Sequence, residues 1–216
     1  MSIPGEGLFR MYRLYGSRST ASLVVHWMLL ELGVPFEVEW LDFDSKAQRS
    51  DDYLRLNPGG VVPTLVVDGA PVAETGAILM LLAERHPEAG FSPPPGTPER
   101  AEWLQWMVWL ANGPMASFRL WFYEDDLPGA DRAALQARIE GFWSRVDAHL
   151  AGRRFMVGDA LSTVDLQLAM LARWSRNMPR PATTWPNVTA WLAPLRARPA
   201  LREVHVREGL SDWINA

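Results

Sequence analysis

The chain has 216 residues, of which 48% are hydrophobic and 21% charged, a composition typical of a globular protein with a sizeable core. Its formal net charge of -4 and the lack of any basic cluster argue against nucleic acid as a partner. It contains no cysteine, which excludes disulfides, thiolate metal sites and a cysteine nucleophile.

The sequence also argues against export, membrane insertion and metal binding. The first ten residues, MSIPGEGLFR, lack the apolar core of a secretory signal peptide. No uninterrupted apolar run reaches roughly 18 residues, so we expect no membrane span and a cytoplasmic protein. None of the four histidines has a second ligand at a metal-binding spacing, and we therefore expect no metal.

The part of the chain before residue 88 predicts a mixed β-sheet with helices. The hydrophobic pattern indicates the order β-α-β-(α)-β-β-α over residues 11–15, 21–32, 36–41, 42–57, 61–67, 71–72 and 74–86. Asp68-Gly69, between two apolar runs, is a typical hairpin turn. The first half therefore predicts a parallel βαβ unit and the second an antiparallel hairpin, joined in one sheet.

A proline-rich stretch, residues 91–98, marks the expected domain boundary. The patterns after it are helical, over residues 99–123, 130–150, 161–177 and 186–197. We therefore expect an α/β domain over residues 11–87, a linker over 88–98 and an all-helical bundle over 99–216.

Pro63 stands at the head of an apolar strand, where a proline removes a sheet hydrogen bond. A cis Val62–Pro63 bond would turn the Val62 backbone outward, so that its N–H and C=O pair with an extended peptide. The alternative is a trans bond at the start of an edge strand. Taken alone, the residues favour the trans bond, because only about 5–6% of X–Pro bonds in folded proteins are cis.

Glu74 and Thr75 stand at the head of the helix that follows the hairpin. The N-terminus of a helix attracts a carboxylate, Thr75 adds a hydroxyl donor, and Glu74 is suited to an ammonium group. Together they would hold the α-carboxylate and α-amine of one amino acid. The simpler interpretation is an ordinary helix cap with an acid in the first turn.

The turn between the first strand and the first helix carries several hydroxyls, in the sequence Gly16-Ser-Arg-Ser-Thr-Ala-Ser22. A hydroxyl at this place could donate a hydrogen bond to a thiolate, and the helix N-terminus would help to lower the pKa of the thiol. The alternative is that these side chains only cap the helix, which is the interpretation we prefer for Thr20 and Ser22.

Taken in order, these segments closely resemble the glutathione transferase superfamily. The N-terminal resemblance covers LYGSRSTASLVVHWMLLELGVPFE, NPGGVVPTLVVDG and ETGAILMLLAERHP. Beyond the linker, Leu161-Ser162-Thr163-Val164-Asp165 is similar to the family's capping box and hydrophobic staple, in which Ser162 caps the helix and Asp165 bonds back to it. The resemblance implies an α/β thioredoxin-like N-terminal domain followed by an all-α C-terminal bundle.

The resemblance also implies a glutathione site. Val62 would pair its backbone with the cysteinyl part of glutathione beside cis-Pro63, while Glu74 and Thr75 would hold the γ-glutamyl end. Lys46 matches a lysine that bacterial beta-class members place near the glycyl carboxylate, although a solvated surface charge explains it equally well.

The thiol-activating residue is where this chain departs from the beta class. Ala21 stands where that class has its cysteine, and Asn112-Gly113 where it has a His-Lys pair. Ser19 matches the catalytic serine of the delta and theta classes, and Tyr15 the catalytic tyrosine of the alpha, mu and pi classes. We predict Ser19 as the catalytic donor, with Tyr15 and Ser17 as alternatives.

The long helix after the linker supplies the expected site for the electrophilic substrate. We name Trp106, Trp109 and Asn112 as its candidate lining residues, although core packing explains any one of the tryptophans as well.

The implied activity is detoxifying conjugation of reduced glutathione to apolar electrophiles by a homodimer. The alternatives are a glutathione-dependent disulfide reductase or β-etherase, and a non-catalytic ligand-binding protein of the same fold. A zeta-like isomerase is disfavoured because its serine-cysteine helix start is absent.

Overall fold

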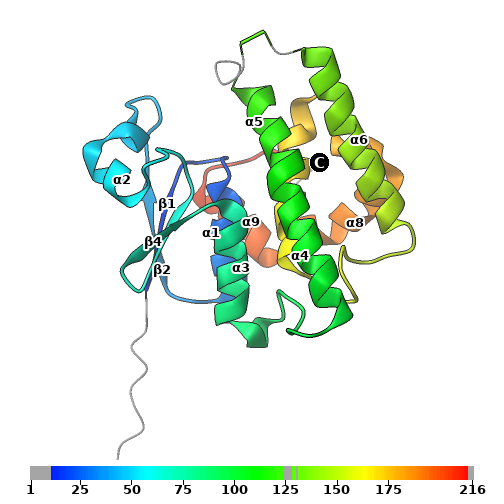
Figure 1. Ribbon diagram of the computed structural model, residues 1–216, viewed down its shortest axis with the longest axis horizontal. Helices are drawn as coiled ribbons and strands as arrows, with labels where there is room; N and C mark the ends of the chain where they lie inside the picture. Colours follow the sequence, from blue (N-terminus) through cyan, green and yellow to red (C-terminus); the bar gives the residue numbers. More distant parts are fainter. Residues whose placement is uncertain (1–10, 124–127, 130, 214–216) are drawn as a thin grey trace, which may run out of the picture. The chain divides into compact units, whose positions relative to one another are not determined.

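The computed structural model describes residues 11–123, 128, 129 and 131–213. The chain divides into two compact units, one ending at Ile78 and the other beginning at Leu79. The first unit contains the sheet and the second is helical (Figure 1). The thioredoxin-like α/β unit and the all-helical unit that the resemblance implies are both present.

The sheet of the first unit has four strands in the order β2-β1-β3-β4. The strands are β1 (Tyr12–Gly16), β2 (Phe36–Trp40), β3 (Thr64–Val67) and β4 (Ala70–Ala73). β1 runs parallel to β2, and β3 is antiparallel to both β1 and β4. This is the expected combination of a parallel βαβ unit and a hairpin, with Asp68 and Gly69 in the left-handed conformation of the turn.

Successive side chains of β1 point to opposite faces of the sheet. Tyr12 and Leu14 are buried, and they lie on the face covered by α1 (Ser22–Leu32), whose side chains are almost all buried. Gly33 ends α1 in the left-handed conformation, as expected for a C-terminal glycine. The opposite face carries Tyr15, whose ring lies 5.8 Å from that of Tyr53. Tyr53 belongs to α2 (Asp51–Leu56), which follows a short 3₁₀ turn over Ala47–Arg49.

The helices that follow the sheet begin with α3 (Thr75–Arg85), in which the division between the two units falls. The others are α4 (Pro98–Leu110), α5 (Ala116–Phe122), α6 (Arg132–Leu150), α7 (Thr163–Trp174), α8 (Pro186–Arg196) and α9 (Pro199–Arg207). α9 is absent from the sequence-based expectation. Short 3₁₀ turns cover Pro87–Ala89, Ser175–Asn177 and Ala182–Thr184.

The single helix expected over residues 99–123 is interrupted by a π-helical turn over Ala111–Met115. Pro114 lies inside this turn and has no N–H to donate, so a regular α-helical hydrogen bond cannot form there. The chain therefore continues as two helices, α4 and α5, on either side of the turn.

Asp165 in the first turn of α7 is a buried centre of hydrogen bonds. Its carboxylate accepts from the backbone N–H of Met156 at 2.9 Å, from both the N–H and the hydroxyl of Ser162 at 3.0 and 2.9 Å, and from Nε1 of Trp191 at 2.9 Å. The expected capping box is therefore present, and it also ties α8 and the preceding loop to the start of α7.

The proline-rich stretch is held to the helical unit. The carbonyl of Phe91 accepts from the N–H of Thr163 at 2.9 Å, and the guanidinium of Arg100 reaches both Ser92 Oγ and the carbonyl of Pro93. Within the described ranges, no helix is long and apolar enough to cross a membrane. The same residues contain no group of three or more potential metal ligands.

Candidate functional site

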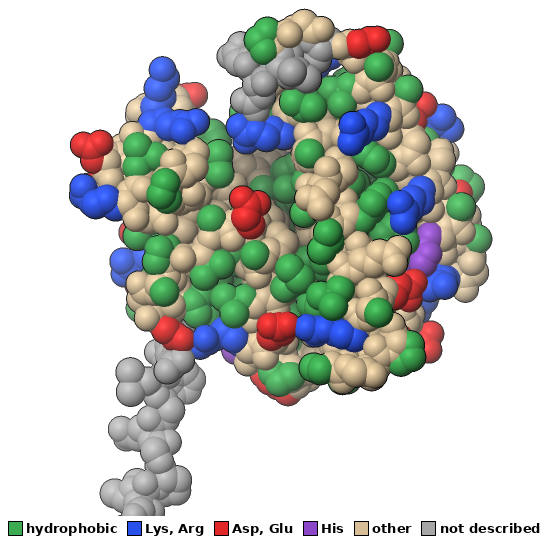
Figure 2. Space-filling view, in the orientation of Figure 1, with side chains coloured by type: hydrophobic (Ala, Val, Ile, Leu, Met, Phe, Trp, Pro, Cys, Tyr) green, Lys and Arg blue, Asp and Glu red, His purple; other side chains and the backbone are tan. Residues whose placement is uncertain are grey.

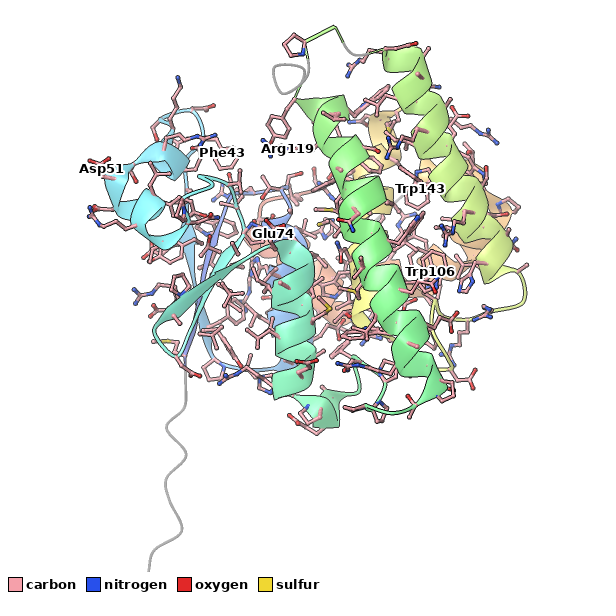
Figure 3. All side chains as sticks on the ribbon, in the orientation of Figure 1. Phe43, Asp51, Glu74, Trp106, Arg119 and Trp143 are labelled. Atoms are coloured by element: carbon pink, nitrogen blue, oxygen red, sulfur yellow. The ribbon has the colours of Figure 1, made fainter. Side chains whose placement is uncertain are left out.

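The register of the sheet brings the predicted glutathione-binding segments to one edge. Tyr15 pairs with Thr64, and Thr64 pairs with Ala73. The residues next to these three along the chain are Gly16, Pro63 and Glu74, so the turn after β1, the loop before β3 and the start of α3 all meet at this edge. Glu74 is labelled at the head of α3 in Figure 3.

Hydroxyl groups brace the turn between β1 and α1. Ser22 Oγ donates to the carbonyl of Ser17 at 2.8 Å and accepts from the N–H of Ser17 at 3.1 Å. Thr20 Oγ1 also lies 2.6 Å from that carbonyl and accepts from the N–H of Ser22. The N-cap residue of α1 is Ala21, which makes no side-chain capping bond. Thr20 and Ser22, which we expected to cap the helix, instead brace the turn before it, and Ser22 is buried.

Gly16 is required for this close approach. A Cβ at position 16 would lie 2.7 Å from Ser22 Oγ and 2.8 Å from Ser22 Cβ. The hydroxyl of Ser22 could then no longer reach the Ser17 backbone.

The turn also carries Ser17 and Ser19. Ser19 is half-buried and has a left-handed backbone with a φ of 62°, which directs its side chain differently from its neighbours. Ser17 is also half-buried, and its hydroxyl has no hydrogen-bond partner among the described residues. Both remain candidates for donation to a bound thiol.

Tyr15 has a different environment. It lies on the α2 face of the sheet against Tyr53, and its hydroxyl interacts with the Arg13 guanidinium, which raises the pKa of Arg13.

The loop before β3 contains a cis Val62–Pro63 peptide bond. The trans bond favoured by the residues alone is therefore wrong, and the bond implied by the resemblance is correct. β3 pairing begins only at Thr64. Among the described residues, neither the N–H nor the C=O of Val62 has a hydrogen-bond partner. An extended peptide can use both groups.

Glu74 and Thr75 differ in exposure. Glu74 is exposed, has a φ of 70°, and its carboxylate has no hydrogen-bond or ion-pair partner within the described parts of the chain. Thr75 is buried as the first residue of α3, where backbone N–H groups lack helical partners. An anion at the helix start and an ammonium at Glu74 would fit side by side.

A cavity of about 350 Å³ lies at the carboxyl ends of β1 and β2, and sequence reasoning missed it. Its lining includes Ser17 and Arg18 from the turn after β1, Trp40 at the end of β2, and Asp42 and Phe43 from the loop after β2. The Arg18 guanidinium lies 5.8 Å from the centre of the Trp40 ring. The predicted parallel pairing was the available signal, because it places these two loops together.

Asp42 and Lys46 shape the loop after β2. The carboxylate of Asp42 accepts from the N–H of Asp44, and hydrogen bonds from Ser45 and Asp44 lower the pKa of Asp42. Lys46 is exposed with a φ of 57°, and its N–H donates to the carbonyl of Phe43 at 3.1 Å.

Trp106 and Trp109, the predicted electrophile-lining residues, pack between α4 and α6. Trp106 is 4% exposed, with its ring centre 4.7 Å from that of His149, and Trp109 stands edge-on to Phe142 at 5.6 Å. The Arg145 guanidinium covers both indoles. Figure 3 labels Trp106 between the two helices. Both indoles therefore take part in helix packing, although Trp109 is only half-buried, and Asn112 is exposed in the π-helical turn. Their role in lining an electrophile site stays a prediction.

Comparison with known protein families gives two matches. Residues 18–85 match the glutathione S-transferase N-terminal domain, and residues 129–193 match the glutathione S-transferase C-terminal domain.

Comparison with individual proteins also finds glutathione S-transferases. The chain is 31% identical over 169 residues to glutathione S-transferase GST-4.5 of Xanthomonas campestris pv. campestris, covering 76% of this chain and 82% of that protein. It is 30% identical over 204 residues to glutathione S-transferase 3 of Zea mays, covering 88% and 91%. A sphingomonad glutathione S-transferase solved with glutathione superposes with a TM-score of 0.82 at 28% identity, over 92% of this chain and 100% of that one.

Proposed function

Because the chain belongs to the glutathione S-transferase family, we propose that it binds reduced glutathione and conjugates it, through the cysteinyl sulfur, to apolar electrophiles. The observation that carries the proposal is the single sheet edge shared by the Ser17–Ser19 turn, the Val62 backbone and the head of α3. These three segments offer groups for the thiol, the peptide and the amino-acid end of one tripeptide.

Each part of glutathione has a proposed partner. The Val62 N–H and C=O pair with the cysteinyl residue, next to Pro63, as in strand addition. The Glu74 carboxylate holds the γ-glutamyl ammonium, and Thr75 with the start of α3 holds the γ-glutamyl carboxylate. Lys46, on the loop after β2, holds the glycyl carboxylate.

Ser19 is the proposed donor to the thiol. A free thiol has a pKa near 8.5, and each unit by which the site lowers it corresponds to about 1.4 kcal/mol of preference for the thiolate. The Ser19 hydroxyl and the start of α1 together supply the stabilisation. The thiolate then attacks an electrophilic carbon, displacing a leaving group or adding across an activated double bond.

The environment of Tyr15 supports this choice of donor, because its ring packs against Tyr53 on the α2 face of the sheet. Ser17 is the second candidate, since it lines the cavity beside the turn. Comparison of Ser17→Ala with Ser19→Ala separates the two.

We further propose a cytoplasmic homodimer in which domains 11–87 and 99–216 are joined by residues 88–98. Two exposed apolar side chains one helical turn apart support a second copy on α4: Leu104 is 41% exposed and Val108 is 52% exposed. In Figure 2, hydrophobic side chains gather along α4, the helix on which we propose that the second copy packs, whereas α6 carries basic side chains. Sedimentation of Val108→Glu tests this, with a shift toward monomer expected.

The activity is tested by turnover of glutathione with 1-chloro-2,4-dinitrobenzene, together with calorimetric binding of glutathione. Saturable binding with turnover is the expected result. Binding without turnover would favour disulfide, β-ether or another electrophile chemistry. An absence of binding would contradict the site assignment.

A further inference from the structure

The loop that carries Val62 is held by two side chains from outside it. Val61 O accepts from the Tyr53 hydroxyl at 2.6 Å and from Asn57 Nδ2 at 2.8 Å. Thr64 Oγ1 lies 2.8 Å from the Tyr53 hydroxyl and 3.1 Å from Asn57 Nδ2. Both side chains therefore reach the same two anchor atoms, one on each side of Val62 and Pro63.

A single placement of hydrogens satisfies all of these contacts. One amide hydrogen of Asn57 goes to Val61 O and the other to Thr64 Oγ1. The Thr64 hydroxyl then donates to Tyr53, and Tyr53 donates to Val61 O. These four hydrogen bonds form a closed ring, in which Val61 O accepts two of them. Asn57 Oδ1 accepts in addition from the N–H of Gly59 at 3.0 Å.

The ring is removed from water. Tyr53 is 3% exposed, Asn57 6% and Thr64 0%. Burial raises the pKa of Tyr53, so its hydroxyl keeps its proton in neutral solution. Hydrogen bonds in such an environment are costly to leave unmade, and they hold their partners in one geometry.

Val62 stands between the two anchor atoms, and its own N–H and C=O are unused within the described parts of the chain. Their direction is consequently set by the residues on either side. A peptide that pairs with both groups requires them at hydrogen-bond distance and angle at the same time.

We propose that Asn57 and Tyr53 are positioning residues for glutathione, which hold the carbonyl of Val61 and the hydroxyl of Thr64 so that the Val62 backbone is aimed at the cysteinyl amide. The inference rests on the proposed function. It differs from a general stabilising role because the two side chains act on the ligand through its contacts with the Val62 backbone.

The test combines protein variants with a ligand analogue. Glutathione methylated on the amide nitrogen between its glutamyl and cysteinyl residues has no N–H to give to the Val62 carbonyl. Tyr53→Phe removes one member of the ring and preserves the aromatic packing. Asn57→Ala removes two donors and is the stronger variant. Calorimetry of both ligands with native and variant protein gives a double-mutant cycle.

The expected result is strong coupling. Tyr53→Phe weakens glutathione binding about fivefold and analogue binding only about twofold, because the analogue has already lost one of the two contacts that the Val62 backbone makes. In steady-state assays the KM for glutathione rises about fivefold while kcat stays within about twofold.

Ser50→Ala is the matched control. Ser50 caps α2 by accepting from the N–H of Tyr53 at 3.3 Å, but it makes no bond to the loop around Val62. It lowers stability and leaves the affinity for both ligands unchanged.

Equal losses for the two ligands in Tyr53→Phe would overturn the positioning role while leaving the glutathione site intact. Native protein that binds no glutathione would overturn the proposed function itself. If Asn57→Ala does not fold, the Tyr53→Phe cycle alone decides the question.

Discussion

Asn57 in the first unit and Asp165 in the second are both buried polar side chains at the centre of several hydrogen bonds, yet their surroundings differ. The four donors around Asp165 belong to the start of α7, the loop before it and α8, and together they complete a helix cap. The acceptors around Asn57 flank Val62, whose own backbone groups are left unused by the described protein. The hydrogen bonds of Asp165 therefore indicate a role in stability. Those of Asn57, which surround backbone groups left unused by the described protein, indicate a role in binding.

The largest expected effect tests the stability side. Asp165→Ala leaves four buried donors without an acceptor, at roughly 1–3 kcal/mol for an unmade buried bond, and we expect a total loss on the order of 3–5 kcal/mol in the free energy of unfolding. Urea denaturation measures it. The exposed Asp159, six residues earlier, is the control, and Asp159→Ala should change the free energy by less than about 0.5 kcal/mol. Equal losses in the free energy of unfolding for Asp165→Ala and Asp159→Ala would contradict the stabilising role of Asp165.

The next prediction concerns the loop that Asn57 braces. Gly60 has a φ of 60°, and a Cβ there would lie 2.6 Å from Arg49 Nη1 and 3.0 Å from the carbonyl of Gln48. We expect Gly60→Ala to cost about 2–3 kcal/mol and to weaken glutathione binding, because the loop must shift.

Gly69→Ala is its matched partner. Gly69 has a φ of 83° with no atom near the added Cβ, so it carries only the backbone penalty of about 1 kcal/mol. Glutathione affinity should stay unchanged there. A loss of affinity at Gly69 would show that binding responds to any weakening of the unit.

A smaller effect concerns pH. Burial lowers the pKa of His205, which lies near Arg173, Asp212 and Glu208 and stacks on Trp213. In the unfolded chain the pKa of this histidine is near 6.5, whereas in the native protein it is lower. Just below pH 6.5 the unfolded chain therefore binds a proton at His205 and the native protein does not. The stability that neutral His205 contributes above about pH 6.5 is therefore lost as the pH falls toward the pKa of His205 in the native protein.

The loss is about 1.4 kcal/mol for each unit between the two pKa values. Denaturation curves of native protein and His205→Gln between about pH 7.5 and 5.5 measure it as a difference in slope. Parallel slopes would mean that His205 is not kept neutral by the fold.

The smallest expected effect is at Ser162, whose hydroxyl is one of the donors to Asp165. Ser162→Ala should cost about 1 kcal/mol in urea denaturation, as for other helix caps. Glutathione affinity should not change. A cost equal to that of Asp165→Ala would mean that the hydroxyl alone carries the cap.

The sequence predicts most of the fold because its signals are local. Asp68-Gly69 marks the hairpin, Gly33 ends α1, and Ser162 with Asp165 marks the start of α7. The π-helical turn at Pro114 was missed, since a periodic pattern can continue through a proline without revealing how the backbone accommodates it.

The site was predicted less completely, for a similar reason. Glu74 and Thr75 are recognisable at the head of a helix, but the contacts of Tyr53 with Val61 and Thr64 join residues 8 and 11 positions apart. The packing of Trp106 and Trp109 on α6 depends equally on which face of α4 is covered. Such pairings arise from tertiary structure, and periodicity alone does not encode them.

The most direct test of the proposed chemistry is the pKa of glutathione bound to the protein, followed by the ultraviolet absorption of the thiolate. We predict a value below the 8.5 of a free thiol in the native protein and in Ser17→Ala, and a higher value in Ser19→Ala, with binding retained in all three. A bound thiol that titrates like free glutathione, or a Ser19→Ala protein that leaves the pKa unchanged, would contradict the assignment of Ser19 as the donor that stabilises the thiolate.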